Sequence, residues 1–327
     1  MSKRTVGLIV RIAVSAALLA FILSLLDLSQ LRDVVAKGNV FWIAAALGVF
    51  VTARLIMARR WQVILRRFAI RVGFGEITWI TFVSASLSSL VPGGLGSDIF
   101  RGVQIVRKYG KLGDVTSSIL IDRVIGIYAT VCLGTFGALL ALAIGVQRTY
   151  LLTFAVLHAV IIGGWMLGYW ISRRVDGLSF GHAALQRYWS GVVSIAQSIT
   201  DFDLLRRIFL AIFTSSVAVQ LCRCLIYFCL YRAYGVAIDP IYFIVFIPLI
   251  FLATQIPISI SGLGITEGML IFLFTPLGAP SETSFAVGIS SYGVLVLFSA
   301  GVVVAWLAAG VGQYVLRELT ARRSGQL

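Results

Sequence analysis

The sequence predicts an all-α integral membrane protein, and three observations support this fold class. Hydrophobic residues make up 59% of the 327 residues and charged residues only 12%, against about 25% charged residues in a typical soluble domain. A soluble fold of this length could not bury so much apolar surface, because burial is limited by surface-to-volume scaling. The apolar residues form long runs, and basic residues lie at the ends of those runs. We therefore expect a single membrane-embedded domain over residues 1–327.

The lengths of the apolar runs predict about six full transmembrane helices. A helix needs about 20 mostly apolar residues to cross the hydrocarbon core. Six runs meet this requirement, namely 6–26, 40–58, 119–145, 150–171, 207–231 and 285–316. Two further apolar regions, 77–108 and 241–278, are interrupted by glycines and prolines. Because each half of these regions is too short to span comfortably, we expect two re-entrant helical hairpins as well.

The positions of the basic residues predict the orientation of the chain. If the N-terminus is cytoplasmic and each hairpin returns to the side from which it came, most of the 27 basic residues lie in the cytoplasm, as the positive-inside rule requires. Both termini are then cytoplasmic. This assignment places one cluster together on the cytoplasmic side: Arg59, Arg60, Arg66, Arg67 and Arg71. The net charge of +14 therefore indicates contact with anionic headgroups and does not indicate nucleic-acid binding.

The predicted elements recur along the chain and indicate an internal repeat. The second span, the glycine break and the third span of one half each have a counterpart in the other half, at a nearly constant offset in the sequence. This recurrence defines repeats at 1–145 and 150–316. Three full spans per half give the halves opposite orientations. Such an inverted 3+3 arrangement is typical of transporters whose site lies between broken helices at the repeat interface.

The segment 172–206 connects two of the predicted spans in the second half. Apolar residues recur in it at helical spacing, with polar residues between them. We expect a cytoplasmic interfacial loop or helix that lies on the leaflet, or a connector that packs on the helical bundle.

The two glycine-rich breaks predict a polar cavity, because irregular backbone at membrane depth must be buried in protein or line such a cavity. They also expose helix N-termini, whose free N–H groups favour anions such as phosphate. We expect a substrate-binding site formed by Gly93, Gly94, Gly96, Ser97, Asp98, Arg101, Gly262, Gly264, Thr266 and Glu267. The alternative is that the glycines only permit close helix packing.

Charged residues inside apolar regions are functional candidates by default. Asp98 and Arg101 share one helical turn, whereas Glu267 has apolar neighbours on both sides. Four further charges are expected to support the site: Arg54, Asp122, Arg123 and Arg223. The alternative for each charge is a structural ion pair or a side chain that reaches the membrane surface.

The sequence shows no catalytic triad, phosphate loop or cluster of metal ligands. The four cysteines lie inside apolar stretches without a partnering histidine cluster. We therefore expect no catalytic residues, no metal and no cofactor.

Three segments together resemble one protein family. They are 88–101 (SSLVPGGLGSDIFR), 121–126 (IDRVIG) and 262–267 (GLGITE), and they resemble the lysylphosphatidylglycerol synthase transmembrane-region, or flippase-like, family over nearly the whole chain. The second glycine motif departs from the Pro-Gly-Gly form, because Ser259, Ile260 and Ser261 precede Gly262.

The resemblance implies a function in lipid movement. In bifunctional members of this family the membrane region moves an aminoacylated phospholipid between leaflets, and a separate soluble domain makes that lipid. Because the chain stops at Leu327, soon after the last predicted span, we expect a stand-alone member without a synthase domain. The expected protein is a lipid flippase or transporter of a bacterial inner membrane that moves an anionic or modified lipid between leaflets. The lipid is expected to be a phospholipid or a polyprenyl- or hopanoid-type lipid.

Two other functions stay open at this point. One is a membrane-embedded lipid transferase that uses the same cavity for chemistry, and the other is a non-transporting partner of a lipid-synthesising enzyme. No ATP-binding motif is visible, so we expect movement that is passive or driven by an ion or proton gradient. The sequence leaves the oligomeric state open.

Overall fold

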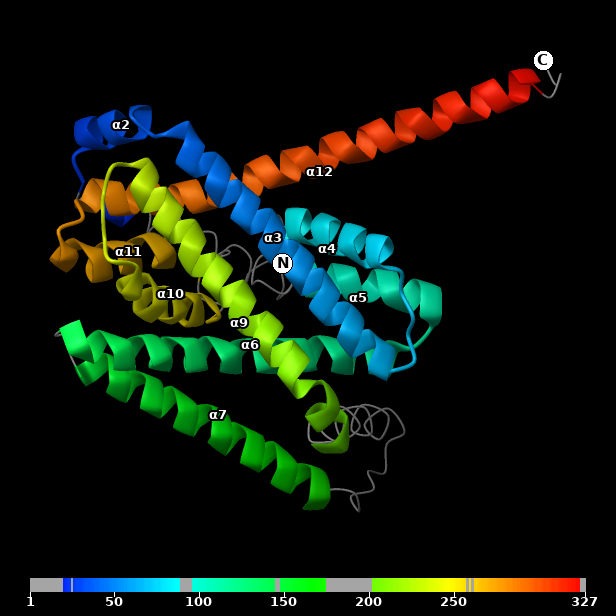
Figure 1. Cartoon of the computed structure of the whole chain (residues 1–327), viewed down its shortest axis with the longest axis horizontal. Coiled ribbons are helices and arrows are strands. Elements are labelled where there is room, and N and C mark those ends of the chain that lie inside the picture. The colour runs from blue at the N-terminus through cyan, green and yellow to red at the C-terminus, as the bar shows by residue number, and fades with distance from the viewer. Residues whose placement is uncertain are drawn as a thin grey trace, which may run out of the picture.

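The computed structural model describes residues 20–24, 26–88, 96–144, 148–174, 202–256, 259 and 262–323. All regular elements in this part of the chain are helices (Figure 1). Five of them are long and apolar enough to cross a membrane: α3 (Val40–Arg67), α6 (Leu112–Ala141), α7 (Arg148–Arg174), α9 (Phe202–Ala233) and α12 (Ser281–Arg323). The sixth predicted span, 6–26, lies largely outside the described residues.

Helix α3 is longer than the predicted span 40–58, because its second part is also buried. Trp61, Ile64 and Leu65 are fully buried there. Arg60 is buried as well and is paired with Asp122. Arg60 therefore differs from the other members of the predicted basic cluster, because the side chains of Arg59, Arg66, Arg67 and Arg71 are exposed.

Each interrupted apolar region forms two short helices. The first region gives α4 (Phe74–Ser88) and α5 (Gly96–Tyr109), and the second gives α10 (Pro240–Thr254) and α11 (Ile265–Phe274). Gly262 and Gly264 have φ angles of 81° and 85°, which side-chain-bearing residues rarely adopt. The outer ends of α4 and α5 lie toward the end of the molecule where α3 terminates, and those of α10 and α11 lie toward the opposite end (Figure 1).

The helices pack on one another in matching sets. The pairs α3–α4, α4–α5 and α5–α6 have counterparts in α9–α10, α10–α11 and α11–α12. Likewise α3–α6 matches α9–α12, and α4–α12 matches α10–α6. The two helices α3 and α9 pack on each other more extensively than any other pair. They therefore form the central contact between the two halves.

The remaining helices are the short elements α2 (Leu28–Ala36), η1 (Leu142–Ile144) and η2 (Thr275–Leu277). The largest hydrophobic core surrounds Tyr231, Phe243 and Phe274, whose rings contact one another between α9, α10 and α11. The segment predicted as an interfacial helix, 172–206, lies mostly outside the described residues.

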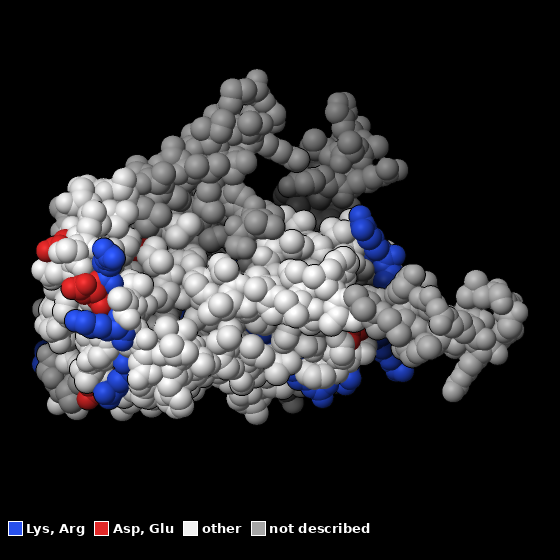
Figure 2. Space-filling view, turned by 90° about the horizontal axis from the view of Figure 1, so that it is seen from above, with Lys and Arg blue, Asp and Glu red and all other residues white. Residues whose placement is uncertain are grey.

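The outer surface carries a broad apolar band. Leu152, Val156 and Val160 recur on one face of α7 and are each more than 60% exposed. In the face shown in Figure 2, Lys, Arg, Asp and Glu gather toward the two ends and leave a wide uncharged zone between them. Such a large exposed apolar surface is suited to lipid and not to water, in agreement with a multi-pass membrane protein.

Candidate functional site

A cavity of about 430 Å³ lies between helices of both halves. Helices α3, α5, α6, α9, α10 and α12 contribute to its lining, as do Gln255 and Ser259 beside the second break. Seven charged side chains line the cavity: Arg54, Arg60, Asp98, Arg101, Asp122, Arg123 and Arg223. Five arginines and two aspartates give these residues a formal charge of +3. The cavity is therefore an electropositive compartment inside an apolar protein.

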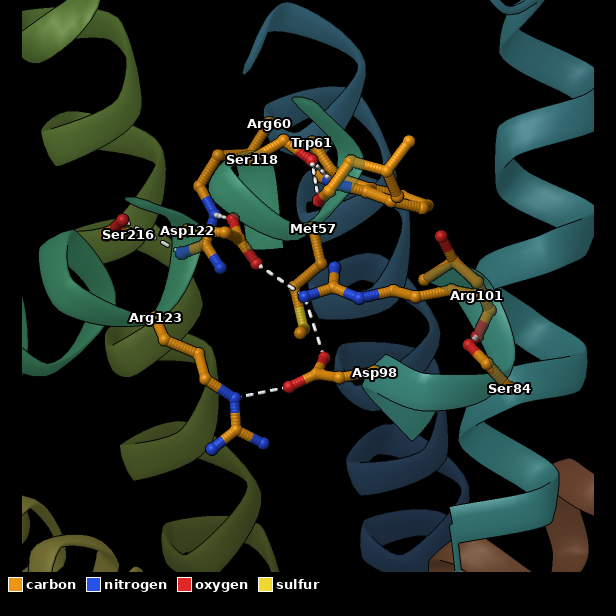
Figure 3. A network of polar contacts seen from close by, with 12 residues as sticks. Met57, Arg60, Trp61, Ser84, Asp98, Arg101, Ser118, Asp122, Arg123 and Ser216 are labelled. Carbon is orange, nitrogen blue, oxygen red and sulfur yellow. Dashed lines mark hydrogen bonds and ion pairs between the residues drawn. The ribbon is translucent and has the colours of Figure 1, made fainter. Parts of the chain in front are cut away.

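Four ion pairs connect most of these charges in one network (Figure 3). Asp122 accepts from Arg60 Nε at 2.7 Å and lies 3.1 Å from Arg101 Nη2. Asp98 lies 2.7 Å from the same Arg101 nitrogen and also pairs with Arg123. Arg101 thus bridges the two carboxylates, and each carboxylate contacts two arginines.

The positions of these residues in their helices explain why the network forms. Asp98 lies in the first turn of α5, where the positive end of the helix dipole stabilises a carboxylate. Arg101 lies one turn further along and shares its face of the helix. Asp122 lies on α6 and reaches across to Arg60 on α3, so the network joins three helices.

Polar and aromatic side chains surround the network and hold it in place. Arg60 Nη1 donates to Ser216 Oγ on α9 at 2.8 Å. The Arg101 guanidinium lies 4.6 Å from the centre of the Trp61 ring, and Trp61 Nε1 donates to Ser118 Oγ at 3.1 Å. Buried charges held in this way are costly to separate, since removing one partner leaves another charge unpaired.

Arg54 and Arg223 line the same cavity but have a different environment. Neither forms an ion pair with a carboxylate in the described part of the chain. The Arg54 guanidinium lies 4.6 Å from the centre of the Phe50 ring. The Arg223 guanidinium lies 3.6 Å from the centre of the Phe251 ring, and its Nη1 donates to Gln220 Oε1 at 3.0 Å. Both arginines are held by uncharged partners.

The second break places its predicted site residues differently. Thr266 Oγ1 donates to the Gly262 carbonyl at 3.1 Å, and Thr266 lines a smaller cavity of about 190 Å³. This smaller cavity shares Arg223 and Tyr292 with the larger one. Glu267 is fully buried, and its Oε2 accepts from the Gly264 N–H at 2.7 Å. It does not line either cavity and instead caps the start of α11.

The structure thus brings most of the predicted charges together but not every predicted residue. Ser97, Asp98 and Arg101 line the larger cavity, together with all four residues predicted as supporting charges. Gly96 is buried at the start of α5, and Gly262 and Gly264 shape the turn before α11. Gly93 and Gly94 lie outside the described residues.

Sequence reasoning missed several lining residues, chiefly Arg60, Gln220 and Ser259. One signal was present, because Arg54, Met57 and Arg60 recur at helical spacing and line the cavity from one face of α3. Arg60 was instead assigned by its place in a run of arginines near the end of an apolar segment.

These features are those of a multi-pass membrane protein with a polar cavity between its apolar helices, close to two helix breaks. Comparison with protein families gives a match to the family described as the lysylphosphatidylglycerol synthase TM region, over residues 8–301. The chain therefore belongs to this family. Searches of curated proteins and of solved structures gave no match.

Proposed function

We propose that this protein moves a lipid between the two leaflets of a membrane, with the lipid headgroup passing through the cavity between the two halves. The observation that carries this proposal is the cavity itself. It has a formal lining charge of +3, and helices long and apolar enough to cross a membrane contribute to its walls. A compartment of this kind offers a polar headgroup a route past the hydrocarbon core, which it could not cross unaided.

The inverted 3+3 repeat with two re-entrant hairpins is part of the proposal. Its support comes from the matching sets of helix contacts and from the opposite directions in which the α4–α5 and α10–α11 pairs point (Figure 1). Broken helices that meet at a repeat interface are the usual binding site of such transporters. The proposal also places both termini in the cytoplasm, as the distribution of basic residues predicts, and the protein in a bacterial inner membrane.

The environment of the two aspartates favours transport over a lipid transferase. A general acid or base must reach the substrate and exchange a proton with it. Asp98 and Asp122 each form ion pairs with two arginines, so both carboxylates are already occupied. The family also leaves room for a lipid-synthesising enzyme as a partner that supplies the transported lipid.

The proposal is tested with purified protein in liposomes that contain phospholipids with a fluorescent group on the acyl chain or headgroup. A membrane-impermeant quencher removes only the outer-leaflet signal from protein-free vesicles. We expect the protein to expose the inner-leaflet pool of at least one lipid to the quencher. Mass spectrometry of the same lipids after incubation in detergent should show no new product. Quenching that stays at the protein-free level for all lipids would refute transport, and a new lipid product would identify a transferase.

A further inference from the structure

We propose that Arg54 and Arg223 form a two-arginine site for a doubly charged phosphate group, so that the lipid carried is a phosphate monoester or diphosphate. This inference rests on the proposed function and names the substrate class of the same cavity. It also gives the charges of the cavity separate tasks. The network of Asp98, Asp122 and their arginines joins the helices, whereas Arg54 and Arg223 supply the charge that attracts the ligand.

The first argument is the balance of charge. The carboxylates of Asp98 and Asp122 form ion pairs with Arg60, Arg101 and Arg123. The five arginines and two aspartates of the lining together give the cavity a formal charge of +3. Arg54 and Arg223 line the same cavity, and like charges inside a protein repel each other more strongly than in water. A bound anion would remove this repulsion.

The second argument is an excess of hydrogen-bond donors. Arg101 Nε and Ser259 Oγ are buried and lack a hydrogen-bond partner in the described part of the chain, and both residues line the cavity. Ser259 is only 3% exposed. Buried polar atoms without partners are rare in folded proteins. A ligand made of acceptor oxygens would satisfy such groups. A phosphate group is such a ligand, and it can accept two parallel hydrogen bonds from one guanidinium group.

The third argument concerns position. Arg54 lies in the middle of α3 and Arg223 in the second part of α9, and these two helices form the central contact between the halves. Aromatic rings and an amide hold the two guanidinium groups at the cavity wall. A ligand there could be held by both halves at once. The volume of about 430 Å³ lies within the usual range for small-molecule sites, about 300–1,000 Å³.

The same charges argue against a cationic headgroup. An aminoacylated phospholipid with a net positive charge would face three uncompensated positive charges in the cavity. A zwitterionic phosphodiester would place its own cation among them. The headgroup with the best electrostatic match carries two or more negative charges and no cation.

The test is a binding measurement in detergent, where no leaflets exist. The probes are short-chain phosphatidic acid, which ends in a phosphate monoester, short-chain phosphatidylcholine, and inorganic pyrophosphate. We expect wild-type protein to bind phosphatidic acid at least about tenfold more tightly than phosphatidylcholine. R54Q and R223Q should each weaken phosphatidic acid binding by about tenfold or more, and R54K should retain part of it.

The matched control is R66Q, because Arg66 is an exposed arginine on the same helix as Arg54. It should bind like wild type. The two glutamine variants should also keep or raise the unliganded melting temperature, since they relieve repulsion and break no ion pair seen in the described residues. Unchanged phosphatidic acid binding in R54Q and R223Q, or equal binding of both lipids by wild type, would overturn the proposal.

The pyrophosphate arm distinguishes a lipid-borne phosphate from a free one. Competition by pyrophosphate in wild type but not in R54Q would show that the phosphate alone is recognised. Phosphatidic acid binding that depends on both arginines and resists pyrophosphate would show that the lipid is required, and either result supports the site. Arginine-dependent binding without movement in liposomes would refute transport and keep this inference. Lipid movement together with binding that does not depend on the two arginines would support transport and refute this inference.

Discussion

The two helix breaks carry an acidic residue at the same place and give it different surroundings. Asp98 and Glu267 both lie in the first turn of the helix that follows the break. Asp98 contacts two arginines at the cavity. Glu267 is fully buried, bonds to the backbone of its own turn, and forms no ion pair within the part of the chain that the structure describes. An acidic residue at this position is therefore expected to stabilise the start of the helix. The residues around it determine whether it also forms ion pairs.

The comparison extends to the residues around each acid. When the two halves are aligned on Asp98 and Glu267 without gaps, the charged residues of the network meet uncharged ones: Arg60, Arg101 and Asp122 correspond to Cys229, Leu270 and Ser291. Apart from Asp98 itself, the charges of the network therefore have no charged counterpart in the second half. The same alignment pairs Arg54 with Arg223, so this position is charged in both halves. Under the proposed repeat, the first break is joined to the bundle by ion pairs, the second by apolar packing, and the arginine pair is common to both.

The largest expected effect tests whether the first half depends on its ion pairs. Asp122→Asn removes the carboxylate that Arg60 and Arg101 share and leaves two buried cations in need of partners. We expect the free energy of unfolding to fall by about 3–5 kcal/mol, measured as a large drop in melting temperature in detergent.

The control for this variant is Asp114→Asn on the same helix. The Asp114 side chain is 44% exposed and lies 3.8 Å from Lys111 Nζ, so its pair should be worth at most about 1 kcal/mol. Equal effects of the two variants would mean that the buried ion pairs of Asp122 stabilise the fold no more than the exposed pair of Asp114 does.

The second test probes the apolar packing that replaces ion pairs at the second break. A Cβ atom on Gly288 of α12 would lie 2.8 Å from Glu267 Cγ, so Gly288→Ala should push α12 away from the start of α11. Overpacking of this kind costs about 1–3 kcal/mol, again read from thermal unfolding.

Gly293→Ala is the matched variant on the same helix, because a Cβ there would meet no atom within 4 Å. It should be neutral or stabilise α12 by up to about 1 kcal/mol, since alanine favours a helix over glycine. A Gly288→Ala variant as stable as Gly293→Ala would show that the second break is loosely packed.

The sequence was sufficient for the helical class and for the two breaks, because apolar length and glycine clusters are local signals. The predicted span 40–58 covers only part of α3, since Arg59 and Arg60 follow an apolar run and resemble a cytoplasmic boundary. The burial of Arg60 depends on its tertiary contact with Asp122, which no local pattern reveals.

The same limit applies to the site. A list of intramembrane charges identified Asp98, Arg101, Asp122 and Arg123, but it could not show which acid pairs with which arginine. Glu267 was grouped with Asp98 because both follow a glycine turn. Their different roles depend on which helix faces each side chain, and that information lies in the packing of the whole bundle.

The smallest expected effect concerns Glu267 and separates its two possible contributions. Glu267→Gln keeps an oxygen for the Gly264 N–H and replaces a buried carboxyl group whose Oε1 has no hydrogen-bond partner in the described residues. Because the amide has nearly the same shape and can make the same hydrogen bond, we expect the free energy of unfolding to change by less than about 1 kcal/mol. Glu267→Ala should cost more, about 1–3 kcal/mol, because it leaves the Gly264 N–H unpaired in a buried turn. Lipid movement in liposomes should persist in Glu267→Gln, because this side chain lines neither cavity. Loss of movement with unchanged stability would place Glu267 in the transport step and make the two breaks functionally equivalent.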